Sequence, residues 1–184
     1  MRQTLQLHPD SRCDAVRRIE VEVVRPAPER LTLHYVVTGS AGDLILPLPA
    51  APDRTDGLWR RTCFEAFLRP GAGEPYYEFN FAPSTQWAAY WFSAYRQGMQ
   101  PAMGIAPPRV AMRRRADGLE VDVGLVLDRA PGLPRAAPWR LGLSVVIEEA
   151  NGRISHWALA HPPGQPDFHH ADAFALQLPG TEAS

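Results

Sequence analysis

Two short aromatic-rich segments carry the polar side chains best suited to bind a ligand. Glu65 stands in CFEAFL, and Glu78 and Asn80 stand in YYEFNF, all among aromatic or apolar neighbours. In an extended strand alternate side chains share a face, so Glu78 and Asn80 share one. Paired positions of an antiparallel hairpin have a constant sum, and an odd sum such as 143 or 145 places Glu65 beside Glu78 or Asn80. An even sum would separate these side chains.

This polar strip has two interpretations. Carboxylates among aromatic rings are costly to bury unless a partner satisfies them. The first interpretation is ion pairing on an exposed sheet face, with Arg60, Arg61 or Arg96 as the cation. The second is a row of acceptors for the hydroxyl groups of a sugar, whose C–H face would stack on an aromatic ring.

A second polar and aromatic group lies near the C-terminus, in PPGQPDFHHADAF at 162–174. A metal site would draw on Asp167, His169 and His170, with His161 as a further ligand. Adjacent histidines of an extended segment point to opposite faces, so this spacing disfavours such a site. A general acid or base role for His161 or His169 lacks an accompanying nucleophile motif or cofactor loop.

A loop that walls a binding site accounts for more of these residues. The three prolines and the glycine of PPGQP restrict the backbone, and Phe168 presents a ring. Asp167 and His169 would then reach ligand hydroxyls. The alternative is purely structural, with Asp167 closing a turn at residue 169 and Phe168 filling the end of the fold.

The polar side chains of the two aromatic-rich segments and of the C-terminal segment must be positioned by strands. Apolar and polar residues alternate along much of the chain, which is typical of half-buried strands. The dipeptides Asp117-Gly118 and Asn151-Gly152 favour tight hairpins. The predicted strands cover 16–24, 31–37, 43–46, 61–68, 76–82, 87–95, 110–116, 119–127, 140–149, 153–159 and 173–178.

This pattern predicts a single all-β domain over 1–184, an antiparallel β-sandwich of the immunoglobulin-like or jelly-roll-like kind. One segment is ambiguous: between 85 and 97, Trp87, Trp91 and Tyr95 recur every four residues, and Gly98 could end a helix. We expect a strand there. Trp87, Trp91 and Trp139 are expected in the core.

Composition excludes some classes of partner. The 19 basic residues, all arginine, nearly balance 20 acidic ones, so neither nucleic acid nor an anionic membrane is expected to bind. The run Arg113 to Arg115 is typical of a solvated edge strand. Cys13 and Cys63 are too few for a disulfide framework or zinc module. Lacking a signal-like apolar stretch or an apolar run of about 18 residues, the chain is expected to be soluble and cytoplasmic.

The stretch LWRRTCFEAFLRP, followed by YYEFNFAPSTQWAAYWF, resembles family 9 carbohydrate-binding modules and the related DOMON-like domains. In that family a Trp lies six residues before a Glu that opens a strand, here Trp59 and Glu65. A second strand carries alternating polar residues that end in Asn, here Glu78 and Asn80. The resemblance covers about residues 55 to 95 and the C-terminal strand.

The resemblance implies that two aromatic rings sandwich the reducing-end sugar. One is Trp59, and the other lies six residues before a Phe of the last strand. Counting back from Phe174 gives Phe168, where the family has a Trp. The family also has a basic residue at the position of Glu78, so the hydrogen-bonding pattern would differ here.

We therefore expect a non-catalytic domain that binds a small polyhydroxylated ligand, and a sugar is the class of ligand that we expect. Alternatives are a haem- or metal-binding domain of the DOMON type, with Met99, Met103 or Met112 as haem ligands, a histidine-dependent hydrolase, and a plain protein interaction module. The expected ligand-binding residues are Trp59, Glu65, Glu78, Asn80, Asp167, Phe168 and His169.

Overall fold

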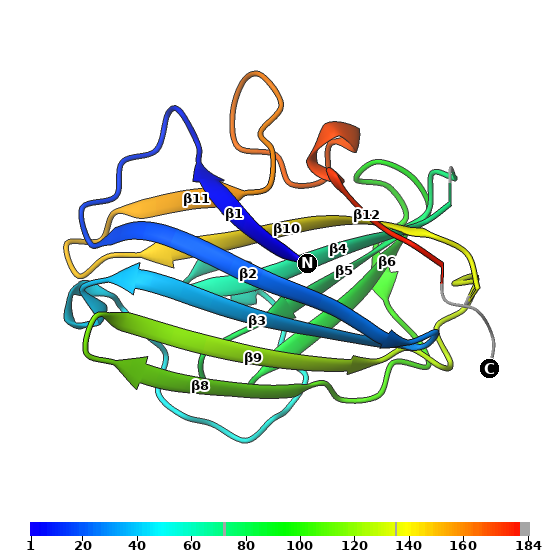
Figure 1. Cartoon of the computed structure of the whole chain (residues 1–184), viewed down its shortest axis with the longest axis horizontal. Coiled ribbons are helices and arrows are strands. Elements are labelled where there is room, and N and C mark those ends of the chain that lie inside the picture. Colours follow the sequence, from blue (N-terminus) through cyan, green and yellow to red (C-terminus); the bar gives the residue numbers. More distant parts are fainter. Residues whose placement is uncertain (72, 135, 181–184) are drawn as a thin grey trace.

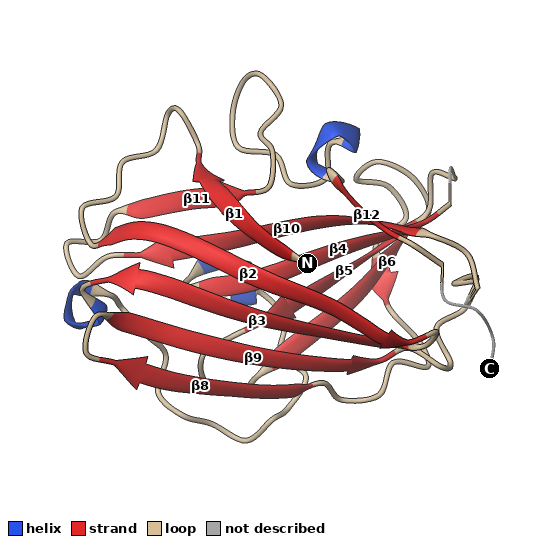
Figure 2. Ribbon diagram, in the orientation of Figure 1, coloured by secondary structure: helices blue, strands red, loops and turns tan. Residues whose placement is uncertain are grey.

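The computed structural model describes residues 1–71, 73–134 and 136–180, which form two antiparallel β-sheets packed face to face (Figures 1 and 2). Sheet A contains, in spatial order, β1 (Arg2–Leu7), β2 (Val16–Ala27), β3 (Arg30–Gly39), β9 (Gly118–Val126) and β8 (Arg109–Arg115). Sheet B contains β7 (Gln100–Pro101), β6 (Trp87–Phe92), β5 (Tyr76–Phe81), β4 (Cys63–Pro70), β10 (Trp139–Glu148) and β11 (Ile154–Ala158). The predicted antiparallel sandwich is confirmed.

β1 connects the two sheets along one side. Its first residues pair with β2, and Gln6 and Leu7 pair with Ala158 and Trp157 of β11. β12 (Leu176–Leu178) pairs with the first residues of β10, on the edge of β10 opposite to β4. The remaining regular elements are the short 3-10 helices η1 (Ala41–Asp43), η2 (Leu58–Arg60) and η3 (Ala171–Ala173).

The core lies between the sheets because each inward face is apolar. Alternate residues of β3, from Leu31 to Val37, are buried against the inward side chains of sheet B. Phe64 and Phe79 belong to this cluster, as does Trp139 at 0% exposure. Burying each such side chain contributes roughly 1.5–3 kcal/mol. The outward face of sheet B is also apolar in part, and loops cover it.

The ambiguous segment is a strand. Trp87–Phe92 pairs with β5 along its whole length, from Phe81↔Trp87 to Tyr76↔Phe92. A helix in this segment would have left one edge of β5 without a partner strand. Hydrogen bonding between strands therefore outweighs the helix-like spacing of four residues between the rings. Trp87 and Trp139 are buried as predicted, and Trp91 is partly buried against the core.

Three details of the prediction were wrong. The segment 43–46 forms only a single bridge, Leu44↔Glu149, because η1 precedes it and Pro47 follows. The strand predicted over 173–178 is limited to Leu176–Leu178, since η3 occupies Ala171–Ala173. β1 and the two-residue β7 were not predicted, because short strands at sheet margins have few alternating positions to reveal them.

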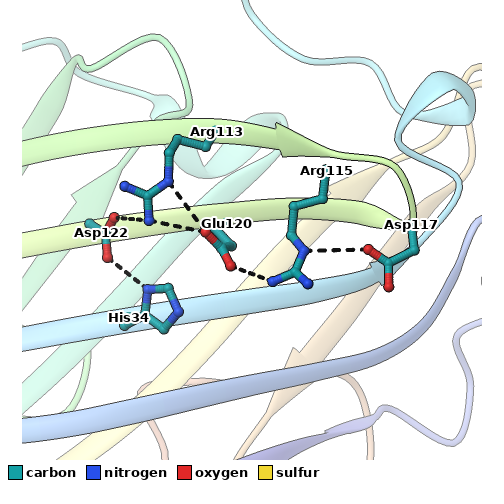
Figure 3. A network of polar contacts seen from close by, with 6 residues as sticks. All are labelled: His34, Arg113, Arg115, Asp117, Glu120 and Asp122. Carbon is teal, nitrogen blue, oxygen red and sulfur yellow. Dashed lines mark hydrogen bonds and ion pairs between the residues drawn. The ribbon is translucent and has the colours of Figure 1, made fainter.

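β8 is the free edge of sheet A, as predicted for the arginine run. Its arginines form an ion-pair network with acidic side chains of β9 and of the intervening turn (Figure 3). The residues of this network are His34, Arg113, Arg115, Asp117, Glu120 and Asp122. Such a charged edge discourages pairing with a strand of another molecule. Across the described ranges, no helix is long and apolar enough to cross a membrane.

One buried hydroxyl links the two sheets. Tyr35 of β3 is 0% exposed, and its hydroxyl donates a 3.2 Å hydrogen bond to the backbone oxygen of Glu65 in β4. We expect Tyr35→Phe to lower the free energy of unfolding by about 1 kcal/mol, because the carbonyl loses a buried donor. Urea denaturation at neutral pH measures this change. An unchanged midpoint would contradict the role of this bond.

Candidate ligand-binding site

The outward face of sheet B gathers the polar strip. β4 and β5 pair with the constant sum 145, so that Glu65 lies opposite Asn80 and Phe67 opposite Glu78. Of the two registers considered from the sequence, the structure has the odd one, which builds the polar strip. β10 places Ser144 opposite Glu65 on the other side. Three adjacent strands therefore present polar side chains on one face, within a sheet that is otherwise apolar.

Two loops and one turn rise over this face and enclose a pocket of about 360 Å³. The first loop contains η2 with Trp59, the second contains Phe168 and His169, and the turn after β6 contains Arg96. The pocket is lined by Trp59, Glu65, Glu78, Phe92, Arg96, Met99, Val146, His156, Pro166, Phe168 and His169. Two sequence segments about 100 residues apart thus meet here, as the sequence analysis expected.

Five of the seven residues expected to bind a ligand line this pocket: Trp59, Glu65, Glu78, Phe168 and His169. The other two support them. Asn80 is 0% exposed, and its amide nitrogen donates a 2.7 Å hydrogen bond to Glu78 Oε1. Asp167 accepts hydrogen bonds from Tyr95 and Arg96, at 2.5 and 2.8 Å, and from the backbone N–H of His169. The last contact is the turn that the structural interpretation predicted.

The two carboxyl groups are buried with few donors. Glu65 is 2% exposed, and its Oε2 accepts a 3.3 Å hydrogen bond from Ser144, whereas Oε1 has no hydrogen-bond partner. Burial, together with the nearby charge of Glu78, raises the pKa of Glu65 well above its usual range. Burial also raises the pKa of Glu78, opposed by the hydrogen bond from Asn80. The first interpretation of the strip, pairing of these carboxylates with Arg60, Arg61 or Arg96, is not found among the described residues: Arg61 pairs with Glu148 and Arg96 with Asp167.

His169 is held by hydrogen bonds in a neutral form. Its Nδ1 lies 2.8 Å from the Tyr76 hydroxyl, and Tyr76 in turn accepts the backbone N–H of Arg96 at 3.2 Å. With Tyr76 donating to Nδ1, the imidazole proton is on Nε2, which lies 3.7 Å from Glu78 Oε2. Burial lowers the pKa of His169 to about 4, so the ring is uncharged at neutral pH. It therefore offers a neutral N–H donor beside an acceptor.

Aromatic side chains form the walls of the pocket and brace one another. Trp59 packs edge-on against Tyr90, with ring centroids 5.8 Å apart. Phe168 contacts Phe67 at 6.4 Å and His156 at 6.0 Å. Except for His156, these rings belong to a second apolar cluster on the outward face of sheet B. Trp59 and Phe168 are thus packed against neighbouring rings and also line the pocket.

Sequence reasoning missed several pocket residues. Phe92 and Val146 share the face of the polar strip, and strand parity would have identified them once the register was known. His156, interpreted from the sequence as structural, faces the pocket because it pairs with Val146. Arg96, considered from the sequence only as an ion-pair partner of the polar strip, lies in a turn where its own φ is 53°, a left-handed conformation. Strand alternation does not determine where a turn residue of this kind points.

The methionines considered for a haem site lie in different parts of the structure. Within the three described ranges, no group of three or more His, Cys, Asp or Glu side chains could hold a metal ion. Of the methionines considered as haem ligands, Met99 lines the pocket, whereas Met103 lines a different cavity and Met112 packs against the core. That second cavity, of about 520 Å³, is lined by residues that carry no charge, Tyr77 and Trp91 among them.

No protein family model matches the sequence, and neither does any curated protein. Solved structures do share its fold. One is a candidate carbohydrate-binding protein from Bacteroides uniformis, with a TM-score of 0.61 and 12% identity over 94% of this chain and 83% of that chain. Another is a family 9 carbohydrate-binding module from Caldicellulosiruptor kristjanssonii in complex with cellotriose, with a TM-score of 0.56 and 10% identity over 89% and 74% of the two chains. The relation to DOMON-like domains stays a prediction.

Proposed function

We propose that this domain binds a small carbohydrate, without catalysis, in the pocket between Trp59 and Phe168. The observation that carries the proposal is the meeting of aromatic walls with two buried carboxyl groups in one pocket of about 360 Å³. A volume of this size lies in the range of small-molecule sites. The similarity in fold to a sugar-bound module adds support.

Each part of a sugar has a counterpart among the pocket residues. The C–H face of a pyranose would stack on the ring of Trp59 or Phe168, which buries apolar surface of both. The hydroxyl groups at the edge of the sugar would stay hydrated. Hydroxyl groups would donate to Glu65 Oε1, which lacks a donor, and accept from His169 Nε2. A net hydrogen bond is worth about 1 kcal/mol and association entropy opposes binding, so we expect micromolar to millimolar dissociation constants.

We expect Trp59→Ala to weaken sugar binding about tenfold or more, because it removes the stacking surface while leaving sheet B intact. Isothermal titration calorimetry against glucose, galactose, cellobiose and maltose measures the effect. Trp91→Ala is the matched control, since Trp91 is also partly buried on sheet B but lines the uncharged cavity. It should leave binding unchanged.

Two results would count against the proposal. One is the absence of a binding signal for every sugar at concentrations of about tens of millimolar, the range in which weak sites saturate. The other is equal weakening by both tryptophan substitutions, which would indicate a general loss of structure. A Soret absorption band in the purified protein would favour the haem alternative instead.

A further inference from the structure

The acidic groups of the pocket outnumber its cations. Glu65 and Glu78 both line it, and Asp167, between the lining residues Pro166 and Phe168, accepts a hydrogen bond from Arg96. The single arginine of the lining, Arg96, is already paired with Asp167 at 2.8 Å, and its side chain is half exposed to solvent. His169 is neutral at physiological pH, because burial lowers its pKa to about 4. Among the described residues, no arginine forms an ion pair with Glu65 or Glu78, and Arg96 acts on Glu78 only through its charge.

One carboxylate oxygen of Glu65 has no hydrogen-bond partner among the described residues. Glu65 is 98% buried, and its Oε1 accepts no hydrogen bond, although the residue lines the pocket. A buried acceptor without a donor costs roughly 1–3 kcal/mol, and more when it is charged. Native proteins rarely keep such a group unless a ligand or water satisfies it. A donor that also carries positive charge would satisfy both the hydrogen bond and the charge.

The described residues around Glu65 already use their donors elsewhere. Glu78 and Asn80 face it from β5, Ser144 from β10, and Cys63 adjoins it on β4. The Asn80 amide is used by Glu78, and the Ser144 hydroxyl bonds the other oxygen of Glu65. Arg96, His169 and His156 are the basic groups of the pocket, and the hydrogen bonds recorded for the first two go to Asp167 and Tyr76.

We propose that the ligand of this pocket carries a protonated amine, and that it is an amino sugar whose ammonium group binds between Glu65 and Glu78. This inference rests on the proposed function and specifies its ligand class. An ammonium group has three donors and no acceptor, which suits the unpartnered Oε1 of Glu65 and the second oxygen of Glu78, Oε2, beside it. The aromatic walls add to the preference, since ring faces attract cations.

Matched pairs of sugars test the inference, because an amino sugar and its parent hexose differ by one group. Calorimetry would compare glucosamine with glucose and galactosamine with galactose at about pH 6, where a sugar amine is protonated. We expect at least one amino sugar to bind about tenfold more tightly than its hexose, as a charge-assisted hydrogen bond allows. Glu65→Gln should abolish this preference, and Glu22→Gln on the outward face of sheet A should keep it.

The outcomes separate the two proposals. If hexoses and amino sugars bind equally well, the ammonium inference is overturned and sugar binding stands. If neither class binds, both proposals are overturned. An amino-sugar preference that survives in both Glu65→Gln and Glu78→Gln would also overturn the inference, because the charge would then act elsewhere. Using both variants keeps the test decisive if one of them fails to fold.

Discussion

Acidification from neutral pH to about pH 4 is expected to destabilise the protein by roughly 3 kcal/mol through His169 alone. Burial lowers the pKa of His169 from its usual 6.5 to about 4 in the folded state. Between these values the unfolded chain binds the proton and the folded chain does not, so stability falls as the pH falls through this window. The magnitude follows from about 1.36 kcal/mol per pKa unit, for a side chain that is 15% exposed.

His169→Gln isolates this contribution. Glutamine keeps polar atoms beside Tyr76 and Glu78 but cannot titrate, so the variant should lose much less stability between pH 6.5 and 4 than the wild type does. Urea denaturation at a series of pH values gives the two slopes. The adjacent His170→Gln is the control, because the His170 side chain is 42% exposed. Parallel slopes for wild type and His169→Gln would show that the ring is not buried in its neutral form.

Glu65→Gln is expected to stabilise the protein by about 1–3 kcal/mol at neutral pH while impairing its binding site. Replacing a buried, poorly satisfied charge by a neutral group of similar volume is commonly stabilising. Glutamine is nearly isosteric with glutamate. Its amide N–H groups could donate to Glu78, which lies on the neighbouring strand β5 two residues from the partner of Glu65. Functional sites often retain such locally unfavourable groups because ligand binding requires them.

The pH dependence of this effect has a definite sign. Burial and the charge of Glu78 raise the pKa of Glu65 above its usual 4.5, so the folded state holds a proton that the unfolded chain releases. Stability from this group is therefore complete below about pH 4.5 and falls as the pH rises towards the folded-state pKa. The advantage of Glu65→Gln over the wild type should grow over the same range.

Thermal unfolding at several pH values measures this difference. Glu22→Gln, on an exposed position of β2, should show no such gain. If Glu65→Gln destabilised the protein at every pH, the carboxyl group would have a stabilising partner in the folded state. That result would also weaken the case for a ligand amine, because the unpartnered oxygen is the basis of that case.

The sequence alone determined which side chains share a face. Alternation is a local property of a strand, so the shared face of Glu78 and Asn80 followed from positions only two residues apart. The sequence left the pairing register of the hairpin open, and the structure has the odd sum that brings Glu65 beside them. The sandwich itself was predictable because eleven alternating segments leave few other ways to bury their apolar faces.

Only the tertiary structure decided which members of the strip reach the pocket. Asn80 does not line the pocket, and its amide donates a hydrogen bond to Glu78. Asp167 does not line it either, because its carboxylate accepts hydrogen bonds from Tyr95 and Arg96. His156 joins the site through the pairing of β11 with β10. The physical reason is that loop conformation and side-chain pairing depend on contacts between segments far apart in sequence, whereas strand faces depend on neighbouring residues alone.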